Sequence, residues 1–152
     1  MNDTQRSQLR RREFGFVFQS FRLFSSLTAL DNVALVLTMV EHPDPYDEAA
    51  RWLDRVALHD RAHHYPDQLS GGECQRVAIA RALATAPRCV IADEPTGNLD
   101  QDTSRLIQTL LFDCLDDTGA SLLLVTHDPT LAAQCPHRYE LTNGQLVATS
   151  SP

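Results

Sequence analysis

LSGGECQRVAIARAL, residues 69–83, and CVIADEPTGNLD, residues 89–100, are the two segments that indicate the fold of this chain. In the first stretch Ser70 and Glu73 have the spacing of a capping box, in which two residues satisfy the free N–H groups at a helix start. This spacing predicts a helix that begins at Ser70 and runs to about Thr85. The second stretch starts with a short apolar run and then turns polar, which is typical of a buried strand that ends at a loop.

An acidic pair follows the buried strand that is predicted over Cys89–Ala92. Asp93 and Glu94 come directly after it, and residues 95–99 form a predicted loop. Asp100 is placed to cap the helix that comes next. A helix, a buried strand and a second helix in succession indicate an α/β fold with a mostly parallel sheet.

The rest of the chain continues this alternation. Further buried strands are predicted over 14–18 and 120–125, and helices over 31–40, 46–58 and 100–117. The last of these helices is expected to bury one apolar face, made of Leu106, Leu110, Leu111, Cys114 and Leu115. Asn143-Gly144 separates two short strands, 138–142 and 145–149, which predicts a C-terminal β-hairpin.

Composition and charge exclude several classes of function. The chain has 152 residues and a net charge of -7, and its 13 basic residues are all arginine. An acidic surface repels nucleic-acid backbones, so nucleic acid is not an expected partner. The longest apolar stretch, 33–40, is far shorter than a membrane-spanning helix, and the four cysteines have no metal-ligand spacing.

Polar side chains follow three of the predicted strands. Gln19 follows the first strand and His127 the third, while Asp93 and Glu94 follow the second. Because ligands bind at the carboxyl ends of parallel strands, we expect these residues to form one site. Carboxylates and an amide suit a magnesium ion and an attacking water, and a histidine can bind a phosphate oxygen. The two glycines after Ser70 let a helix start approach an anion closely.

These segments resemble the motifs of ATP-binding cassette (ABC) ATPases. The resemblance rests on the signature motif at 69–73, the Walker B strand at 90–95, the D-loop at 97–100, the switch-histidine loop at 125–128 and the Q-loop at 17–19. All five occur in the family's order and together cover nearly the whole chain. The finer pattern at 18–21, 27–33 and 93–100 is similar to cassettes of the lipoprotein-release, macrolide-export and cell-division transporters.

The resemblance implies a P-loop NTPase fold that is incomplete in these residues. It places one partial ABC ATPase domain over 1–152, with a helical subdomain over about 28–86. The catalytic-core remainder is then 11–19 and 87–149. The mostly parallel sheet and the C-terminal hairpin belong to that remainder.

The resemblance also implies ATP and Mg2+ as cofactors and a head-to-tail dimer with a second cassette as the working form. It assigns Ser70, Gly71, Gly72 and Glu73 to the ATP held by the partner cassette, Asp93 to magnesium, Glu94 to the general base, Gln19 to magnesium or the attacking water, His127 to the γ-phosphate and Asp100 to the link between the two ATP sites. In this family transmembrane permease subunits hold the cassette at the inner, cytoplasmic face of the membrane. The implied activity is an ATPase coupled to transport.

The P-loop of the family does not occur in these residues. The pattern G-x-x-x-x-G-K-[ST] needs a lysine, and the chain has none. The chain is therefore expected to hold roughly the C-terminal two-thirds of a cassette and to bind ATP weakly by itself. Loss of the P-loop strand is expected to remove a strand partner from Cys89–Ala92 and its neighbours and to leave backbone groups and apolar surface uncovered. Poor solubility of the isolated chain follows from that expectation.

Two other functions fit parts of the sequence. A non-catalytic interaction module could supply the signature residues Ser70–Glu73 in trans to a complete cassette. A DNA-repair or chromosome-associated cassette would carry a coiled coil or a zinc module between the Q-loop and the signature. The segment 20–68 has neither heptads nor cysteine pairs, so the transporter branch fits better.

Overall fold

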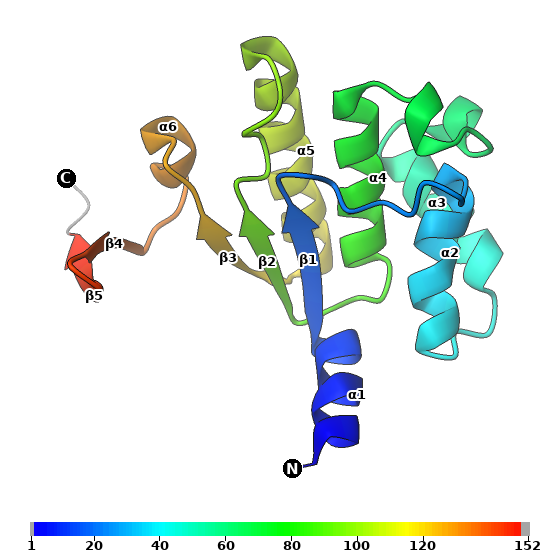
Figure 1. Ribbon diagram of the computed structural model, residues 1–152, viewed down its shortest axis with the longest axis horizontal. Coiled ribbons are helices and arrows are strands. Elements are labelled where there is room, and N and C mark those ends of the chain that lie inside the picture. The colour runs from blue at the N-terminus through cyan, green and yellow to red at the C-terminus, as the bar shows by residue number, and fades with distance from the viewer. Residues whose placement is uncertain (1, 150–152) are drawn as a thin grey trace.

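The computed structural model describes residues 2–149 (Figure 1). Its elements in chain order are α1 (Asp3–Glu13), β1 (Phe14–Phe18), α2 (Ala29–Met39), α3 (Pro45–Arg55), η1 (His59–Arg61), η2 (Pro66–Gln68), α4 (Gly71–Leu83), β2 (Cys89–Asp93), α5 (Gln101–Thr118), β3 (Ser121–Val125), α6 (Pro129–Ala132), β4 (Arg138–Thr142) and β5 (Gln145–Thr149). The predicted strands and long helices are all present, with ends that differ by at most three residues from those predicted. Helices α1 and α6 and the two short 3-10 helices were not predicted.

The centre of the molecule is a parallel sheet in the order β1-β2-β3. Phe18 pairs with Asp93, and Asp93 pairs with Val125, so the three strands end together. We call this end of the sheet the carboxyl edge. Helices α4 and α5 also begin there, at the top of the sheet in Figure 1. The predicted α/β class with a mostly parallel sheet is confirmed.

One face of the sheet is covered and the other is open. Val17, Val90 and Ala92 point to the covered face and are fully buried. On the opposite, open face Leu123 is 55% exposed and Val125 is 52% exposed. Figure 1 shows α4 and α5 on the covered side only. The expectation that residues 120–125 form a buried strand is therefore wrong for one side of β3.

The free edges of the sheet lie beside β2 and not on it. β2, which begins at Cys89, was expected to lose a strand partner along with its neighbours, but it is hydrogen-bonded to β1 on one side and to β3 on the other. The free edges belong to those neighbours, β1 and β3. Parallel sheets are normally covered on both faces, so the open face is the unusual feature of this fold.

Helices α2 and α3 pack against α4 on the side away from the sheet, and the three form a helical layer beside it (Figure 1). Thr28 caps α2 through a reciprocal capping box with Asp31. Leu37 and Leu53 are fully buried between these helices, and Trp52 is 4% exposed. Burial of side chains of this size contributes about 2 kcal/mol each to the stability of the folded state.

The buried face of helix α5 differs in part from the predicted one. Leu106 was expected to be buried but is 71% exposed, whereas Ile107 is buried. The buried stripe continues through Leu111, Cys114 and Leu115 as predicted. Gly119 ends the helix with a φ of 68°, a left-handed conformation that glycine adopts without strain.

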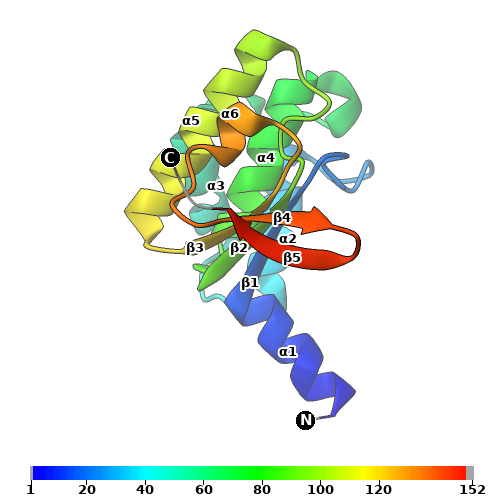
Figure 2. The ribbon, with the colours of Figure 1, turned by 90° about the vertical axis from the view of Figure 1, so that its left-hand side faces the viewer.

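The C-terminal hairpin forms as predicted. Strands β4 and β5 pair antiparallel around Asn143 and Gly144, which have φ values of 50° and 77°. Figure 1 shows the hairpin beyond β3, and it lies in front of the sheet in Figure 2, which looks from that side. Leu141 and Leu146 on the hairpin are 71% and 72% exposed. Across residues 2–149, none of the helices has the length and apolar character that crossing a membrane requires.

Candidate functional site

The predicted site residues that follow the three strands meet at the carboxyl edge. Since β1, β2 and β3 end in register at Phe18, Asp93 and Val125, the residues after them start from the same edge. Glu94 and His127 are brought into direct contact there. Gln19 reaches the loop that follows Glu94.

Glu94 is held by three hydrogen bonds from the segment after β3. His127 donates to Glu94 Oε1 from its backbone N–H at 2.8 Å, and its Nδ1 lies 2.6 Å from the same oxygen. The hydroxyl of Thr126 donates to Oε2 at 3.1 Å. Glu94 itself has a φ of 45°, an unusual value for a side chain of this size. The surrounding bonds thus hold a strained residue in one orientation.

The Glu94 carboxylate changes the pKa of His127. The hydrogen bond and the negative charge of Glu94 raise the pKa of His127 above its usual value of 6.5, although the imidazole is exposed to solvent. The raised pKa favours the imidazolium form, which donates to the carboxylate. Thr126 was not predicted as a site residue, and its position one residue before His127 is the only sequence signal for it.

Asp93 is exposed at the end of β2, beside the position where Gln19 leaves β1. A carboxylate and an amide oxygen are ligand types that Mg2+ accepts, and Mg2+ is bound in proteins through one or two carboxylates with phosphates and waters filling the other positions. Within residues 2–149 no group of three or more His, Cys, Asp or Glu side chains is arranged to hold a metal ion. The residues present therefore fit an ion that arrives with a phosphate ligand.

Gln19 and Asn98 bind each other. Gln19 Nε2 donates to Asn98 Oδ1 at 3.1 Å, and Asn98 Nδ2 donates to the backbone oxygen of Gln19 at 3.0 Å. Gly97 makes room for this pair, since a Cβ at that position would lie 2.7 Å from Gln19 Nε2. Sequence analysis singled out Gln19 but not Asn98, because a contact between residues this far apart leaves no local pattern.

The predicted signature residues form the start of α4. The hydroxyl of Ser70 accepts a hydrogen bond from Glu73 N at 3.2 Å, and Glu73 Oε2 accepts one from Ser70 N at 2.8 Å. This confirms the predicted capping box. The hydrogen bond from the Ser70 backbone also lowers the pKa of Glu73, although partial burial opposes it. Ser70 and Gly71 remain exposed.

A buried amide ties this helix to the segment after Glu94. Gln75 is fully buried and donates from Nε2 to the backbone oxygen of Pro95 at 2.6 Å. Gln75 was not predicted as a site residue. A polar side chain on the buried face of an apolar helix was the signal available in the sequence.

Asp100 caps α5 as predicted. Its Oδ1 accepts a hydrogen bond from the backbone N–H of Thr103 at 3.0 Å. Hydrogen bonds from the side chain and the backbone of Thr103 lower the pKa of Asp100. Among the described residues no hydrogen bond or ion pair joins Ser70–Glu73 or Asp100 to Glu94 or His127. The signature residues and the Glu94–His127 pair are thus separate parts of the same edge.

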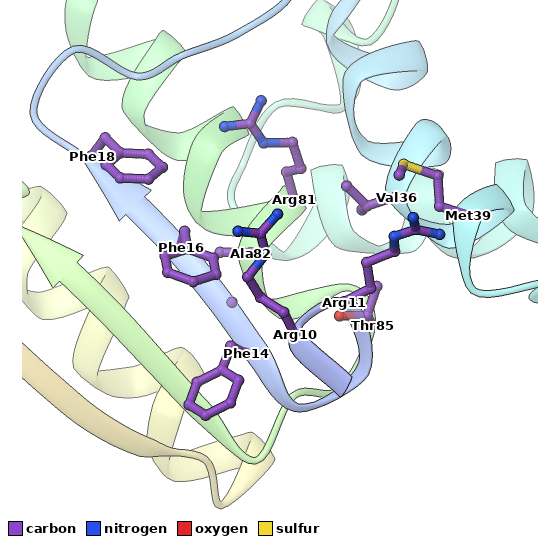
Figure 3. Close-up of a pocket in the computed structure, with 11 residues that line it drawn as sticks. Arg10, Arg11, Phe14, Phe16, Phe18, Val36, Met39, Arg81, Ala82 and Thr85 are labelled. Carbon is purple, nitrogen blue, oxygen red and sulfur yellow. The ribbon is translucent and has the colours of Figure 1, made fainter. Parts of the chain in front are cut away.

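A cavity of about 220 Å3 lies away from all of these residues, beside β1 and the last turn of α1 (Figure 3). Its walls are apolar, with Phe14, Phe16 and Phe18 from the strand. Arg10 and Arg11 from α1 project toward it in Figure 3. Arg81 is turned to the loop after Gln19, where it donates to the backbone oxygens of Phe21 and Arg22 at 2.9 and 2.7 Å. No residue of the predicted site lines this cavity.

Comparisons with known proteins agree with the motif analysis. The model of the family described as ABC transporter matches residues 1–97. The chain is 46% identical over 152 residues to the lipoprotein-releasing system ATP-binding protein LolD of Hydrogenovibrio crunogenus, an alignment that covers 99% of this chain and 66% of that relative. It is 47% identical over 149 residues to LolD of Alcanivorax borkumensis, covering 96% of this chain and 65% of the relative. The chain thus spans about two thirds of the length of these curated relatives.

A solved structure matches the fold as well. The dimeric ATP-binding cassette MJ0796, in a post-hydrolysis state bound to ADP and Pi, superposes with a TM-score of 0.85 at 37% identity. The match covers 99% of this chain and 68% of that chain. A second dimeric structure of MJ0796 superposes with a TM-score of 0.83 at 39% identity, covering 96% and 66% of the two chains.

Proposed function

Because the chain belongs to the ABC transporter family, we propose that it forms the hydrolytic and signature-bearing part of a cassette that hydrolyses ATP to drive transport. The observation that carries this proposal is the contact between Glu94 and His127 at the carboxyl edge of the sheet. A carboxylate and a histidine in direct contact, next to a free carboxylate, provide a base, a phosphate contact and a metal ligand within one short edge.

In this proposal Glu94 accepts the proton of the water that attacks the γ-phosphate. Its two oxygens are oriented by Thr126 and His127, so the carboxylate has one fixed direction before substrate arrives. His127 contacts the γ-phosphate, and its raised pKa supports a protonated ring that can donate to a phosphate oxygen. Fixed donors of this kind stabilise negative charge that develops in the transition state.

Mg2+ supplies charge neutralisation of the phosphates when it is bound with ATP. Asp93 and Gln19 are the residues we assign to hold it. The exposure of Asp93 and the orientation of Gln19 by Asn98 support this assignment. Asn98 accepts from the Gln19 nitrogen, so the Gln19 amide oxygen is the atom left for an ion or a water.

In this proposal the signature residues contact the ATP that a second cassette binds in a head-to-tail dimer. These residues are Ser70, Gly71, Gly72 and Glu73. Exposure of Ser70 and Gly71 at a helix start supports an anion contact, because free N–H groups point outward there. Asp100 links the two ATP sites across the dimer. Transmembrane permease subunits and a position at the cytoplasmic face of the membrane complete the proposal.

Lipoprotein release is the transport process we propose. It rests on the names of the LolD relatives, which share 46% and 47% of aligned residues with this chain. The proposed ATPase also needs a lysine-containing phosphate loop, which these 152 residues do not contain.

The proposal is tested on the protein as its own cells make it. Glu94→Gln keeps the size of the side chain and its hydrogen-bonding oxygen but removes the base. We expect ATP hydrolysis to fall about 100-fold or more while ATP binding is retained. Glu140→Gln, on the exposed hairpin, is the matched control and leaves hydrolysis unchanged. Hydrolysis by Glu94→Gln at the wild-type rate would contradict the proposal.

A second candidate function is a non-catalytic module that supplies the signature to a complete cassette in trans. The fully formed capping box of Ser70 and Glu73, together with the absence of lysine, favours it. In that case the 152-residue chain would stimulate hydrolysis by a complete LolD-like cassette, and Ser70→Arg would abolish the stimulation. Lack of stimulation by the folded chain rules out this candidate.

A further inference from the structure

The starts of α4 and α5 touch through one side chain. Gly72 lies in the first turn of α4, and Thr103 lies in the first turn of α5. A Cβ built on Gly72 would be 2.6 Å from the methyl carbon Cγ2 of Thr103, which is closer than real Cβ atoms approach. Thr103 therefore leaves no room for any side chain at position 72.

The same threonine is bound to Asp100. Its backbone N–H donates to Asp100 Oδ1 at 3.0 Å. Thr103 is β-branched and lies in a helix, so its side chain has few allowed rotamers. One residue thus binds the Asp100 carboxylate through its backbone and presents its methyl group to Gly72.

A neighbouring contact reinforces this arrangement. A Cβ on Gly71 would lie 3.2 Å from Cδ2 of Leu99, the residue before Asp100. Both glycines of the signature therefore pack against residues 99–103 of their own chain. Packing within the chain therefore also favours glycine at positions 71 and 72, in addition to the close approach of a ligand.

We propose that Thr103 is a positioning residue that sets the distance between Asp100 and the backbone of Gly72. The proposal rests on the proposed function, in which Asp100 spans the dimer interface and Gly72 contacts the ATP of the second cassette. A displacement of Asp100 moves Thr103, and the methyl group of Thr103 then moves the start of α4. The two elements that face the partner cassette are in this way coupled inside one chain.

The test is a rescue experiment in the protein as its own cells make it. Gly72→Ala pushes against the Thr103 methyl group, and we expect kcat for ATP hydrolysis to fall by about 10-fold to 100-fold, since small misplacements have effects of this size. Adding Thr103→Ser removes that methyl group and keeps the backbone N–H that binds Asp100. The double variant is expected to recover most of the lost kcat.

Two controls test whether rescue depends on removing this methyl group. Thr103→Val keeps a methyl group in the same place, so combined with Gly72→Ala it is not expected to rescue kcat. Thr109→Ser removes a methyl group from an exposed threonine further along α5 and is not expected to rescue it either. A kcat of Gly72→Ala that stays low with Thr103→Ser overturns the proposal.

Failure of the proposed function gives a different result. If the wild-type protein does not hydrolyse ATP, the positioning role is overturned together with the proposed function. The free energies of unfolding of Gly72→Ala, Thr103→Ser and the double variant then still report whether the two residues are in contact. If the wild-type protein is active and rescue fails, only the role of Thr103 is overturned.

Discussion

Gln19 and Asn98 lie 79 positions apart in the sequence and hold each other through two hydrogen bonds. One bond fixes the side chain of Gln19, and the other fixes its backbone. Gly97 lets the two segments approach closely enough for both. The end of β1 and the loop after β2 are therefore joined at the point where the proposed magnesium ligand leaves the sheet.

Asn98→Ala removes both bonds, so the Gln19 amide loses its orientation. In the protein as its own cells make it, we expect kcat for ATP hydrolysis to fall about 10-fold with little change in KM, because ATP contacts elsewhere are untouched. Steady-state kinetics measures the split. Asn98→Asp can still accept from Gln19 Nε2 but cannot donate to its backbone oxygen, and an intermediate kcat is expected. A change confined to KM would contradict the role given to Asn98.

The contact between Glu94 and His127 is expected to depend on pH. Because Glu94 raises the pKa of His127, the stabilisation from this contact is complete below the usual value of 6.5 and is lost as pH rises through the raised pKa. NMR titration of the His127 ring measures the midpoint. Glu94→Gln is expected to lower that midpoint toward 6.5, and Glu140→Gln to leave it unchanged. An equal midpoint in the wild type and in Glu94→Gln would disprove the coupling.

Asn32 is expected to be the most sensitive polar residue of the helical layer. It is fully buried, its Oδ1 accepts from Phe24 N at 2.8 Å, and its Nδ2 lies 3.0 to 3.1 Å from three backbone oxygens. Asn32→Ala leaves these buried groups unpaired, and we expect the free energy of unfolding to fall by about 3 kcal/mol. Urea unfolding measures it. Asn32→Asp retains the acceptor but loses the donor, so it is also expected to destabilise. A loss under about 0.5 kcal/mol in both variants would contradict this account.

The open face of the sheet gives a prediction with an internal control, because Leu122 and Leu123 are neighbours on opposite faces of β3. Leu122 packs against the core, whereas Leu123 is 55% exposed. In the 152-residue chain we expect Leu123→Thr to change the free energy of unfolding by less than about 0.5 kcal/mol and to reduce binding of a hydrophobic dye. Leu122→Thr is expected to cost about 2 kcal/mol. Equal losses in the two variants would show that the face is covered.

Local patterns in the sequence were sufficient for most of the fold. The Ser70–Glu73 capping box and the Asn143-Gly144 turn each depend on residues within a few positions, and both are present as predicted. The helix over residues 101–118 was predicted, but its buried face was not fully identified. Leu106 and Ile107 are both apolar, so hydrophobicity alone did not decide which of them faces the core.

The site was predictable only where strand ends defined it. Register placed Glu94 and His127 at one edge, and their contact follows from that geometry. Asn98, Gln75 and Thr103 were missed because their contacts Gln19, Pro95 and Gly72 are distant from them in the sequence. The exposed side of β3 was missed because an apolar strand is expected to be covered, and hydrophobicity does not reveal what covers it.

The pairing of β1 with β2 has a kinetic consequence. These strands are neighbours in the sheet, yet α2, α3 and α4 all lie between them in the sequence. The chain has to close this long loop before β1 can pair with β2, which costs conformational entropy, whereas the helices contact one another over shorter separations. We therefore expect the helical layer to gain protection from hydrogen exchange first and the sheet to follow, with Val17 and Val90 among the late residues.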